Sequence, residues 1–310
     1  MIKPKGLKIG DTLGVVAPAS PTTKEKVQLA QEKLTEMGFK VIMGESCYSN
    51  YGYLAGSDEL RAEDLNSMFE NKEVDGIICL RGGYGTPRIL DLLDYDLIKN
   101  NPKVFIGYSD ITALHIAFNQ LSNLVTFHGP MVASDIIGQF SEFSKKSLYN
   151  AILEDEFEPY LKDPLDKVIT INGGVAEGPI IGGNLSLITS TIGTPYEIDT
   201  REKILFIEEI GEEPYKIDRM LTQLKLSKKL EDSIGIILGD FNNCVPESSE
   251  YDDSLTLEQV IDSIIKPLGK PTIYNFKAGH CEPVVTIPFG VRARMNADNK
   301  ELTLLERTIN

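Results

Sequence analysis

Short apolar runs and longer amphipathic segments alternate along the first 130 residues of the chain. The apolar runs are rich in β-branched side chains and end at glycine, proline or polar residues, which is typical of strands. The segments between them have helical spacing, and two of them begin at capping residues, Thr22 or Thr23 and Ser57. Strands that alternate with helix-length segments predict βαβ units and a parallel, helix-covered sheet. The predicted strands are 12–17, 40–43, 75–80, 103–106 and 124–127.

The order of predicted elements changes in the second half of the chain. Strand-like runs at 168–171 and 175–181 flank a glycine pair, and further strands and helices follow, one helix starting with Pro214 at its first position. Residues 284–295 and 301–306 pair naturally as a hairpin. This half should therefore be mixed β and α, with more antiparallel pairing than the first half.

The chain has 310 residues, more than a single hydrophobic core usually organises, so two domains are expected. The hydrophobic content of 42% and charged content of 25% are ordinary for a soluble globular protein. We predict an α/β fold with a Rossmann-like first domain at 1–140, a linker region at 141–166 and a mixed second domain at 167–310.

The formal net charge of −15 argues against nucleic acid or an anionic membrane surface as a partner, because either would require a basic face. No run approaches the roughly 18 uninterrupted apolar residues of a membrane span, and no apolar stretch follows the first residues as in a secretion signal. We therefore expect a cytoplasmic protein.

Neither a metal nor a cofactor is expected. The four cysteines are far apart and the three histidines do not form a ligand motif, so no metal-binding set is visible. Glycines at 82, 83 and 85 follow a predicted strand, but Arg88 occupies the place of the third glycine of a dinucleotide fingerprint. A pyrophosphate-binding loop is therefore a weak interpretation.

A candidate nucleophile lies in the stretch Val104 to Thr112, where an apolar run stops at a glycine, Ser109 follows, and helical spacing begins at once. A serine at such a strand-to-helix turn resembles a nucleophile elbow, although Ile111 replaces its second glycine. The backbone N–H groups of the first helical turn can face an oxyanion. An alternative is that Ser109 or Asp110 only caps the helix.

The glycine turn after residue 80 has two interpretations. It can expose backbone N–H groups near Ser109, as an oxyanion hole requires. It can also be a tight turn that needs positive φ, and the residues alone favour this second interpretation.

A serine nucleophile needs a base. His115 lies within the predicted helix after Ser109 and is better explained as a packed residue, while His128 ends the fifth strand and is a minor candidate. His280 follows a glycine in an irregular loop, which is a better place for an exposed imidazole. Glu208 and Glu209 end a buried strand, and because successive side chains alternate, only one of them should point inward to orient the base.

The sequence resembles the serine L,D-carboxypeptidases, a family that also includes the microcin-immunity peptidases, from Ile9 to about Leu304. Six blocks carry the resemblance: Arg81-Gly82-Gly83-Tyr84-Gly85, Gly107-Tyr108-Ser109-Asp110, Phe127-His128-Gly129-Pro130, Gly182-Gly183-Asn184-Leu185, Phe206-Ile207-Glu208-Glu209 and Gly279-His280.

The resemblance implies a Rossmann-like domain, a second domain with a swivelling β-barrel-like core, and a Ser-Glu-His triad at their interface. The nucleophile then corresponds to Ser109, the acid to Glu208 and the base to His280. The oxyanion donors correspond to the backbone amides of Asp110 and Gly83, which reverses the preference for a merely structural glycine turn. Members of this family are commonly homodimers, and we expect the same here.

The substrate that the resemblance implies is a small peptide, murein tetrapeptide, cleaved at the L,D bond before its terminal D-alanine during cell-wall recycling. Candidate substrate-binding residues are Arg81, Tyr84 and Asn184. Two alternatives remain: a microcin-immunity-type peptidase that cleaves an aminoacyl-nucleotide amide, and a two-domain binding module without catalysis. Aromatic stacking would suit an adenine ring, so the lack of tryptophan weakens the nucleotide alternative but leaves tyrosine and phenylalanine available.

Overall fold

The computed structural model describes residues 1–246 and 254–310. Its chain divides into two compact units. Unit 1 consists of Met1–Glu158, Thr286–Gly290 and Arg307–Asn310, and unit 2 consists of Pro159–Val285 and Val291–Glu306. Unit 1 extends beyond the predicted boundary at 140 because helix α5, which begins inside the predicted linker, buries Leu148 and Ile152.

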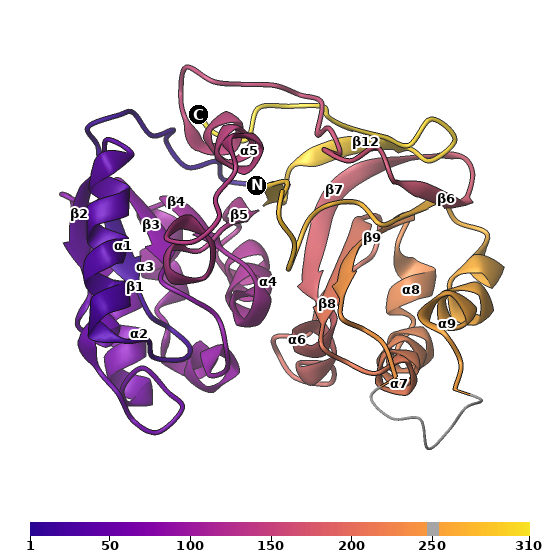
Figure 1. Ribbon diagram of the computed structural model, residues 1–310, viewed down its shortest axis with the longest axis horizontal. Helices are drawn as coiled ribbons and strands as arrows, with labels where there is room; N and C mark the ends of the chain where they lie inside the picture. The colour runs from indigo at the N-terminus through magenta and orange to yellow at the C-terminus, as the bar shows by residue number, and fades with distance from the viewer. Residues whose placement is uncertain (247–253) are drawn as a thin grey trace. The chain divides into compact units, whose positions relative to one another are not determined.

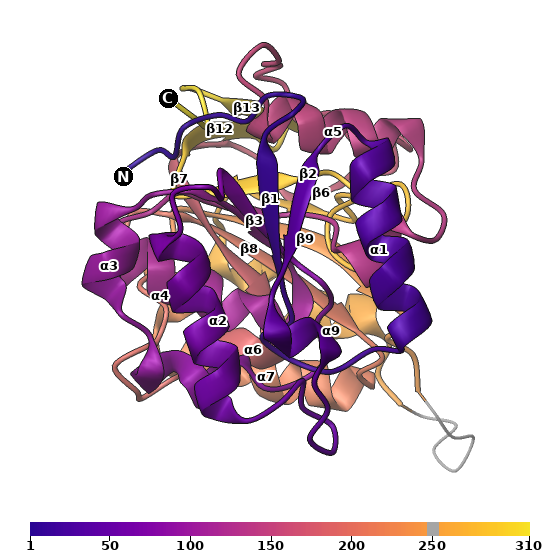
Figure 2. The ribbon, with the colours of Figure 1, turned by 90° about the vertical axis from the view of Figure 1, so that its left-hand side faces the viewer.

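A six-stranded sheet forms the centre of unit 1 within the described residues, in the order β2-β1-β3-β4-β5-β11. The first five strands pair in parallel, as predicted, and β11 is antiparallel to β5. Figure 2 looks at this unit from its β2 edge and shows α2, α3 and α4 on one side of the sheet and α1 on the other. The strands are β1 (Thr12–Val16), β2 (Lys40–Met43), β3 (Gly76–Cys79), β4 (Val104–Gly107), β5 (Thr126–His128) and β11 (Ile287–Phe289).

Helices α1 (Lys24–Glu36) and α2 (Asp58–Glu70) of unit 1 begin at the capping residues that the sequence predicts. The Thr23 hydroxyl accepts a hydrogen bond from the Lys26 N–H, and the Ser57 hydroxyl accepts one from the Leu60 N–H. Each bond satisfies an N–H group that has no partner inside its helix, so the predicted starts are confirmed. The helices are α1 (Lys24–Glu36), α2 (Asp58–Glu70), α3 (Tyr95–Asn100), α4 (Thr112–Leu121) and α5 (Glu142–Ile152), with 3₁₀ turns at Glu45–Tyr48, Thr86–Leu92 and Ser109–Ile111 and a π-helical turn at Val132–Ile136.

Unit 2 is built on a sheet of seven strands among the described residues, in the order β13-β12-β7-β8-β9-β10-β6. Strands β7, β8, β9 and β10 are parallel, whereas β12, β13 and β6 are attached by antiparallel pairing. The expected increase in antiparallel pairing is confirmed, and the sheet curls as a half-barrel (Figure 1). The strands are β6 (Ile169–Asn172), β7 (Val175–Asn184), β8 (Ile204–Ile210), β9 (Gly235–Asn242), β10 (Thr272–Tyr274), β12 (Arg292–Asn296) and β13 (Glu301–Leu304).

The helices of unit 2 gather on the β8–β9 part of its sheet in Figure 1. Pro214 opens α7 at its first position, as predicted from its fixed φ and missing N–H group. The helices are α6 (Leu185–Ser190), α7 (Pro214–Leu226), α8 (Lys229–Asp232) and α9 (Leu257–Ile264), with a 3₁₀ turn at Lys266–Leu268.

The predicted final hairpin is correct in its second half only. Strands β12 and β13 pair in antiparallel register, with Asn296 opposite Glu301. The predicted strand 284–295 is interrupted at Gly290, where φ is 88°. Residues before this glycine form β11 and return to the sheet of unit 1, a long-range pairing that local hydrophobic patterning does not encode.

Within residues 1–246 and 254–310, every helix falls short of the length and apolarity that crossing a membrane requires.

Candidate active site

The predicted nucleophile of unit 1 lies on a strained turn between β4 and α4. β4 ends at Gly107, and Ser109 has a φ of 63°, in the left-handed region that L-residues rarely adopt. Holding a serine there costs about 1–2 kcal/mol, and strain of this kind is concentrated at functional turns. Neither Ser109 nor Asp110 caps the helix through its side chain, so the capping alternative is not what the structure shows.

The glycine turn after β3 packs directly on this serine. A Cβ atom added to Gly82 would lie 3.0 Å from the Cβ of Ser109, so the two turns are in contact. Gly83 has a φ of 119°, and an added Cβ would overlap the hydroxyl of Ser20. That hydroxyl also accepts a hydrogen bond from the Tyr84 N–H at 3.1 Å. A side chain at position 83 is therefore excluded both by conformation and by space.

The hydrogen bonds of the Gly82 carbonyl determine which way the Gly83 N–H group, the predicted oxyanion donor, points. The Gly82 oxygen accepts hydrogen bonds from the Ser20 N–H at 3.4 Å and from Arg81 Nε at 3.2 Å. The C=O and N–H bonds of a trans peptide point in opposite directions. The Gly83 N–H therefore points away from Ser20, and no carbonyl in the described part of unit 1 accepts it. A donor meant for an oxyanion needs this vacancy before substrate binds.

Asp110 connects the two turns through its carboxylate. The side chain is fully buried, and its Oδ2 accepts a hydrogen bond from the Thr86 N–H at 2.8 Å. The Thr86 hydroxyl donates to the backbone oxygen of Asp110. Burial raises the pKa of Asp110 to about 6, against the lowering effects of the hydrogen bonds and of Arg61. Asp110 is therefore mostly ionised at neutral pH, and burying its charge lowers the stability of the folded protein.

We expect Asp110→Asn to stabilise the folded protein increasingly as the pH rises. The folded pKa of Asp110 is about 6 and its ordinary value is 3.8, so its contribution to stability is complete below pH 3.8 and lost as the pH rises through 6. Asparagine does not ionise, so the variant loses no stability at this position as the pH rises. Urea unfolding of both proteins should show their stability difference growing by about 3 kcal/mol in favour of the variant between pH 3 and pH 7.5. Parallel stability curves would contradict the raised pKa.

The two other histidines of unit 1 are packed residues. His115 is fully buried and its Nε2 lies 2.8 Å from the Gly107 oxygen, to which it donates. Burial lowers the pKa of His115 to about 4, so the ring is neutral at pH 7. His128 is also fully buried, with ring contacts to Tyr108 and Phe289. The interpretation of His115 as packed is confirmed, and the burial of His128 disfavours it as a base.

Unit 2 contains the predicted acid and base as a bonded pair. The Nδ1 atom of His280 lies 2.6 Å from Oε2 of Glu208, whose side chain is fully buried. An ionised carboxylate only accepts hydrogen bonds, which places the imidazole proton on Nδ1 and leaves Nε2 as the nitrogen that can take a proton. This is the arrangement of an oriented general base.

The loop that carries His280 is held by its neighbours in unit 2. Gly279 has a φ of 108°, and an added Cβ would lie 2.6 Å from Oε2 of Glu208, so only glycine allows this approach. The Asn242 amide donates to the backbone oxygen of His280 at 2.6 Å. These contacts hold the backbone of the loop that places the imidazole against its carboxylate.

Glu208 bonds to the histidine and Glu209 bonds to other residues, as the alternation of side chains predicts, but Glu209 is not exposed. Both glutamates are buried, because β8 is covered on both faces. Glu209 accepts hydrogen bonds from the Asn184 amide at 2.8 Å and from the Ser186 N–H at 2.8 Å. Asn184 also caps α6 by accepting the Leu187 N–H. Asn184 thus has structural partners, and its binding role stays a prediction.

The other predicted binding residues lie in unit 1. Arg81 donates to the backbone oxygens of Gly82 and Pro21, both at 3.2 Å, rather than to an acid. Tyr84 is 49% exposed, and its ring centroid lies 5.8 Å from that of Tyr53. Both side chains border the glycine turn, and their roles in binding stay predictions.

Sequence reasoning missed the supporting residues of the turns. Ser20 and Arg61, from other segments of unit 1, bond to backbone groups of the glycine turn, and the Thr86 hydroxyl donates to the backbone oxygen of Asp110. Ser20 lies in a proline-rich turn after β1. The sequence predicts this turn, but it does not indicate that Ser20 bonds to the glycine turn. Nothing in the local pattern around Arg61 or Thr86 marks them as more than ordinary helix and loop residues.

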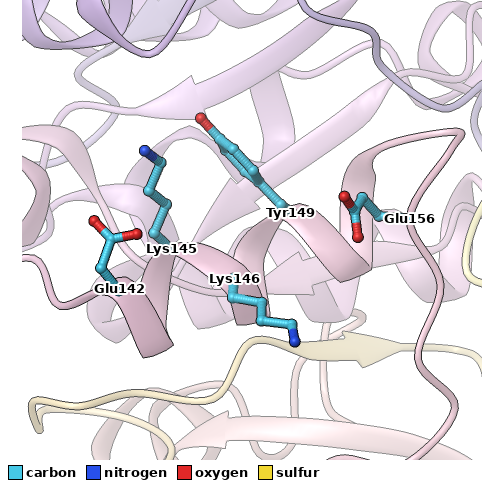
Figure 3. Close-up of a pocket in the computed structure, with 5 residues that line it drawn as sticks. All are labelled: Glu142, Lys145, Lys146, Tyr149 and Glu156. Atoms are coloured by element: carbon cyan, nitrogen blue, oxygen red, sulfur yellow. The ribbon is translucent and has the colours of Figure 1, made fainter.

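A shallow pocket over α5 of unit 1 is a separate feature (Figure 3). Lys145 and Tyr149 point to one side of the helix and Lys146 to the other, and the Lys145 ammonium lies 5.6 Å from the Tyr149 ring centroid. The lining has both signs of charge and none of the predicted site residues, so we assign it no chemistry. Its lining residues are Glu142, Lys145, Lys146, Tyr149 and Glu156.

Among the described residues, no group of three or more His, Cys, Asp or Glu side chains is arranged to hold a metal ion.

Two family models match the chain. The LD-carboxypeptidase N-terminal domain matches residues 13–129, and the LD-carboxypeptidase C-terminal domain matches residues 177–295. The first range contains Ser109, and the second contains Glu208 and His280. The matched ranges therefore separate the predicted nucleophile from the predicted acid and base.

Individual relatives extend this similarity to nearly the full chain. "Probable murein peptide carboxypeptidase" of Bacillus subtilis is 48% identical over 299 residues, which cover 96% of this chain and 92% of the relative. The crystal structure of muramoyltetrapeptide carboxypeptidase from Oxalobacter formigenes has a TM-score of 0.81 and 28% identity, covering 94% of this chain and 97% of that one.

A third relative has a different named role. The microcin C7 self-immunity protein MccF of Escherichia coli is 28% identical over 97% of this chain and 95% of its own length. A solved structure of MccF in complex with aspartyl sulfamoyl adenosine has a TM-score of 0.90, with 25% identity in the structural alignment and full coverage of both chains.

Proposed function

The chain belongs to the LD-carboxypeptidase family, and we propose that it is a serine-type L,D-carboxypeptidase that releases the terminal D-alanine of murein tetrapeptide. The observation that carries this proposal is the strained Ser109, placed on a strand-to-helix turn against a glycine turn with an unpaired N–H group. Backbone strain of this kind is concentrated at active sites, ligand clamps and switch regions, so it supports a functional role for Ser109. The 48% identity to a protein named for murein peptides supports the substrate.

In the proposed mechanism the Ser109 hydroxyl attacks the peptide carbonyl carbon while Nε2 of His280 takes its proton. Glu208 keeps the imidazole in the required tautomer and stabilises its cation. The backbone amides of Asp110 and Gly83 hold the oxyanion. His280 then protonates the departing amine of D-alanine as the C–N bond breaks, and water hydrolyses the acyl-enzyme by the reverse sequence of proton transfers.

The remaining parts of the proposal concern substrate contacts and setting. Arg81, Tyr84 and Asn184 would contact the peptide, and no cofactor would be needed. We place the reaction in the cytoplasm, where murein peptides are recycled, and propose that the protein acts as a homodimer.

The runner-up is a microcin-immunity-type peptidase that cleaves an aminoacyl-nucleotide amide. MccF has been solved with aspartyl sulfamoyl adenosine, and this chain presents Tyr53 and Tyr84 as exposed rings that could stack on a base. The chain contains no tryptophan, and its 48% identical relative is named for murein peptides, so the murein substrate is favoured.

Product identification by mass spectrometry tests the proposal. The purified protein is incubated with a defined murein tetrapeptide, with its epimer ending in L-alanine, and with a peptidyl sulfamoyl-adenosine. We expect one equivalent of D-alanine and the tripeptide from the first substrate only. Cleavage of the nucleotide conjugate alone would favour the runner-up, and binding without turnover of any compound would favour a binding module.

A further inference from the structure

Arg61 is the largest fully buried side chain among the described residues, and it lies on the first turn of α2. A buried guanidinium is costly unless its N–H groups are paired. Its Nη1 donates to the Pro18 oxygen at 2.5 Å and to the Gly85 oxygen at 2.9 Å, and its Nη2 bonds to Asp58. One nitrogen therefore joins two loops that are far apart in the sequence.

These loops follow β1 and β3, which are neighbours in the sheet. The order β2-β1-β3-β4-β5 changes direction between β1 and β3, because the chain moves from β1 to one side for β2 and then to the other side for β3. In open α/β sheets such a switch point separates the loops at the carboxyl ends of two strands and leaves a crevice for ligands. Arg61 ties the two loops together at this point.

The Gly85–Thr86 peptide carries the connection on to the nucleophile turn. Its oxygen accepts from Arg61, and its N–H donates to the Asp110 carboxylate at 2.8 Å. A single planar peptide is thus held at one end by a cation and at the other by an anion. An added Cβ at Gly85 would lie 2.7 Å from the guanidinium, so the close approach requires glycine.

We propose that Arg61 is a positioning residue for the oxyanion hole, because its bonds to Pro18 and Gly85 hold the glycine turn in register with the Ser109 turn. We call Arg61, the Gly85–Thr86 peptide, the Thr86 hydroxyl that donates to the Asp110 backbone oxygen, and Asp110 the buried brace. The brace rests on the proposed function, since it positions two backbone N–H groups that matter only if an oxyanion forms there. Arg61 itself bonds to Pro18, Gly85 and Asp58, so it acts through the glycine turn and is not a catalytic residue.

The brace predicts a particular kinetic signature. Oxyanion donors bind charge that develops only in the transition state, so moving them lowers kcat and leaves substrate binding nearly unchanged. A role in stability alone would reduce the fraction of active protein without changing the rate per active site. Normalising each rate to sites titrated with a fluorophosphonate separates these two effects.

The test compares three variants with the wild type. Arg61→Lys keeps the charge but cannot make the same set of bonds, and Thr86→Val keeps the backbone N–H and volume but removes the hydroxyl bond to Asp110. Lys103→Gln is the matched control: Lys103 is another buried cation of unit 1, donating to the backbone oxygens of Met68 and Asn71 at the other end of α2. The Lys103→Gln variant should destabilise unit 1 without changing any bond of the glycine turn or the Ser109 turn.

We expect the kcat per active site to fall ~10- to 100-fold in Arg61→Lys and about tenfold in Thr86→Val, with KM within about twofold in both. Lys103→Gln should keep the wild-type kcat per site. The rate of fluorophosphonate labelling should follow the same order, and it requires no knowledge of the natural substrate.

An unchanged kcat and labelling rate in Arg61→Lys, or in Thr86→Val if the first variant does not fold, would overturn the brace. A wild type that labels but does not cleave murein tetrapeptide would overturn the substrate and leave the brace to be decided by labelling.

Discussion

Ser109→Ala is expected to lower the turnover of murein tetrapeptide by at least about 10⁴-fold, with the protein still folded. The loss follows because no other atom replaces the attacking oxygen. The Ser109 hydroxyl has no hydrogen-bond partner within the described part of unit 1, so its removal leaves no buried group unsatisfied. Steady-state kinetics and circular dichroism check both statements.

Two companion variants sharpen this prediction. Ser109→Gly should be equally inactive but more stable by about 1 kcal/mol, because glycine adopts the φ of 63° without strain. Ser67→Ala, at an exposed serine of α2, should keep full activity. Retained turnover in Ser109→Ala would rule out the proposed nucleophile, and a less stable Ser109→Gly would rule out stored strain at this turn.

Glu208→Gln should lower kcat about 10³- to 10⁴-fold while leaving KM nearly unchanged. A glutamine can present an N–H to Nδ1 of His280, which would stabilise the wrong tautomer and block proton transfer through Nε2. The 2.6 Å bond between Nδ1 and Oε2 makes this side chain the direct partner of the imidazole. Full kinetics for the tetrapeptide measure the effect.

The neighbouring glutamate provides the control for this variant. Glu209 is also buried and is the next residue along β8, but it bonds to Asn184 and Ser186 instead of the histidine. Glu209→Gln should therefore change kcat less than about tenfold. Equal losses in the two variants would mean that burial, and not the orientation of His280, explains the effect of Glu208→Gln.

The sequence was sufficient for elements whose signals are local. The Ser57 cap, the Pro214 helix start and the turn at Ser109 each depend on a few consecutive residues, and all three are found in the structure. The glycine before His280 was also identified as a point of backbone freedom, and its φ of 108° confirms this.

The rest depends on contacts between distant segments. Gly290 divides a continuous apolar run into β11 and β12, which join different sheets, and no local pattern reports that choice. Arg61 looks like an ordinary charged position of a helix, yet the topology places it under the loops after β1 and β3. Both glutamates of β8 are buried because the strand is buried on both faces from Ile204 to Glu209, which the alternation rule alone does not reveal.

The most direct measurement of the central claim is the site and rate of labelling by a fluorophosphonate, mapped by peptide mass spectrometry. The account predicts a single adduct on Ser109, formed ~100-fold or more slowly in His280→Gln, because the proposed mechanism requires His280 as the general base for Ser109. An adduct on another serine, or equal labelling rates in the wild type and His280→Gln, would contradict it.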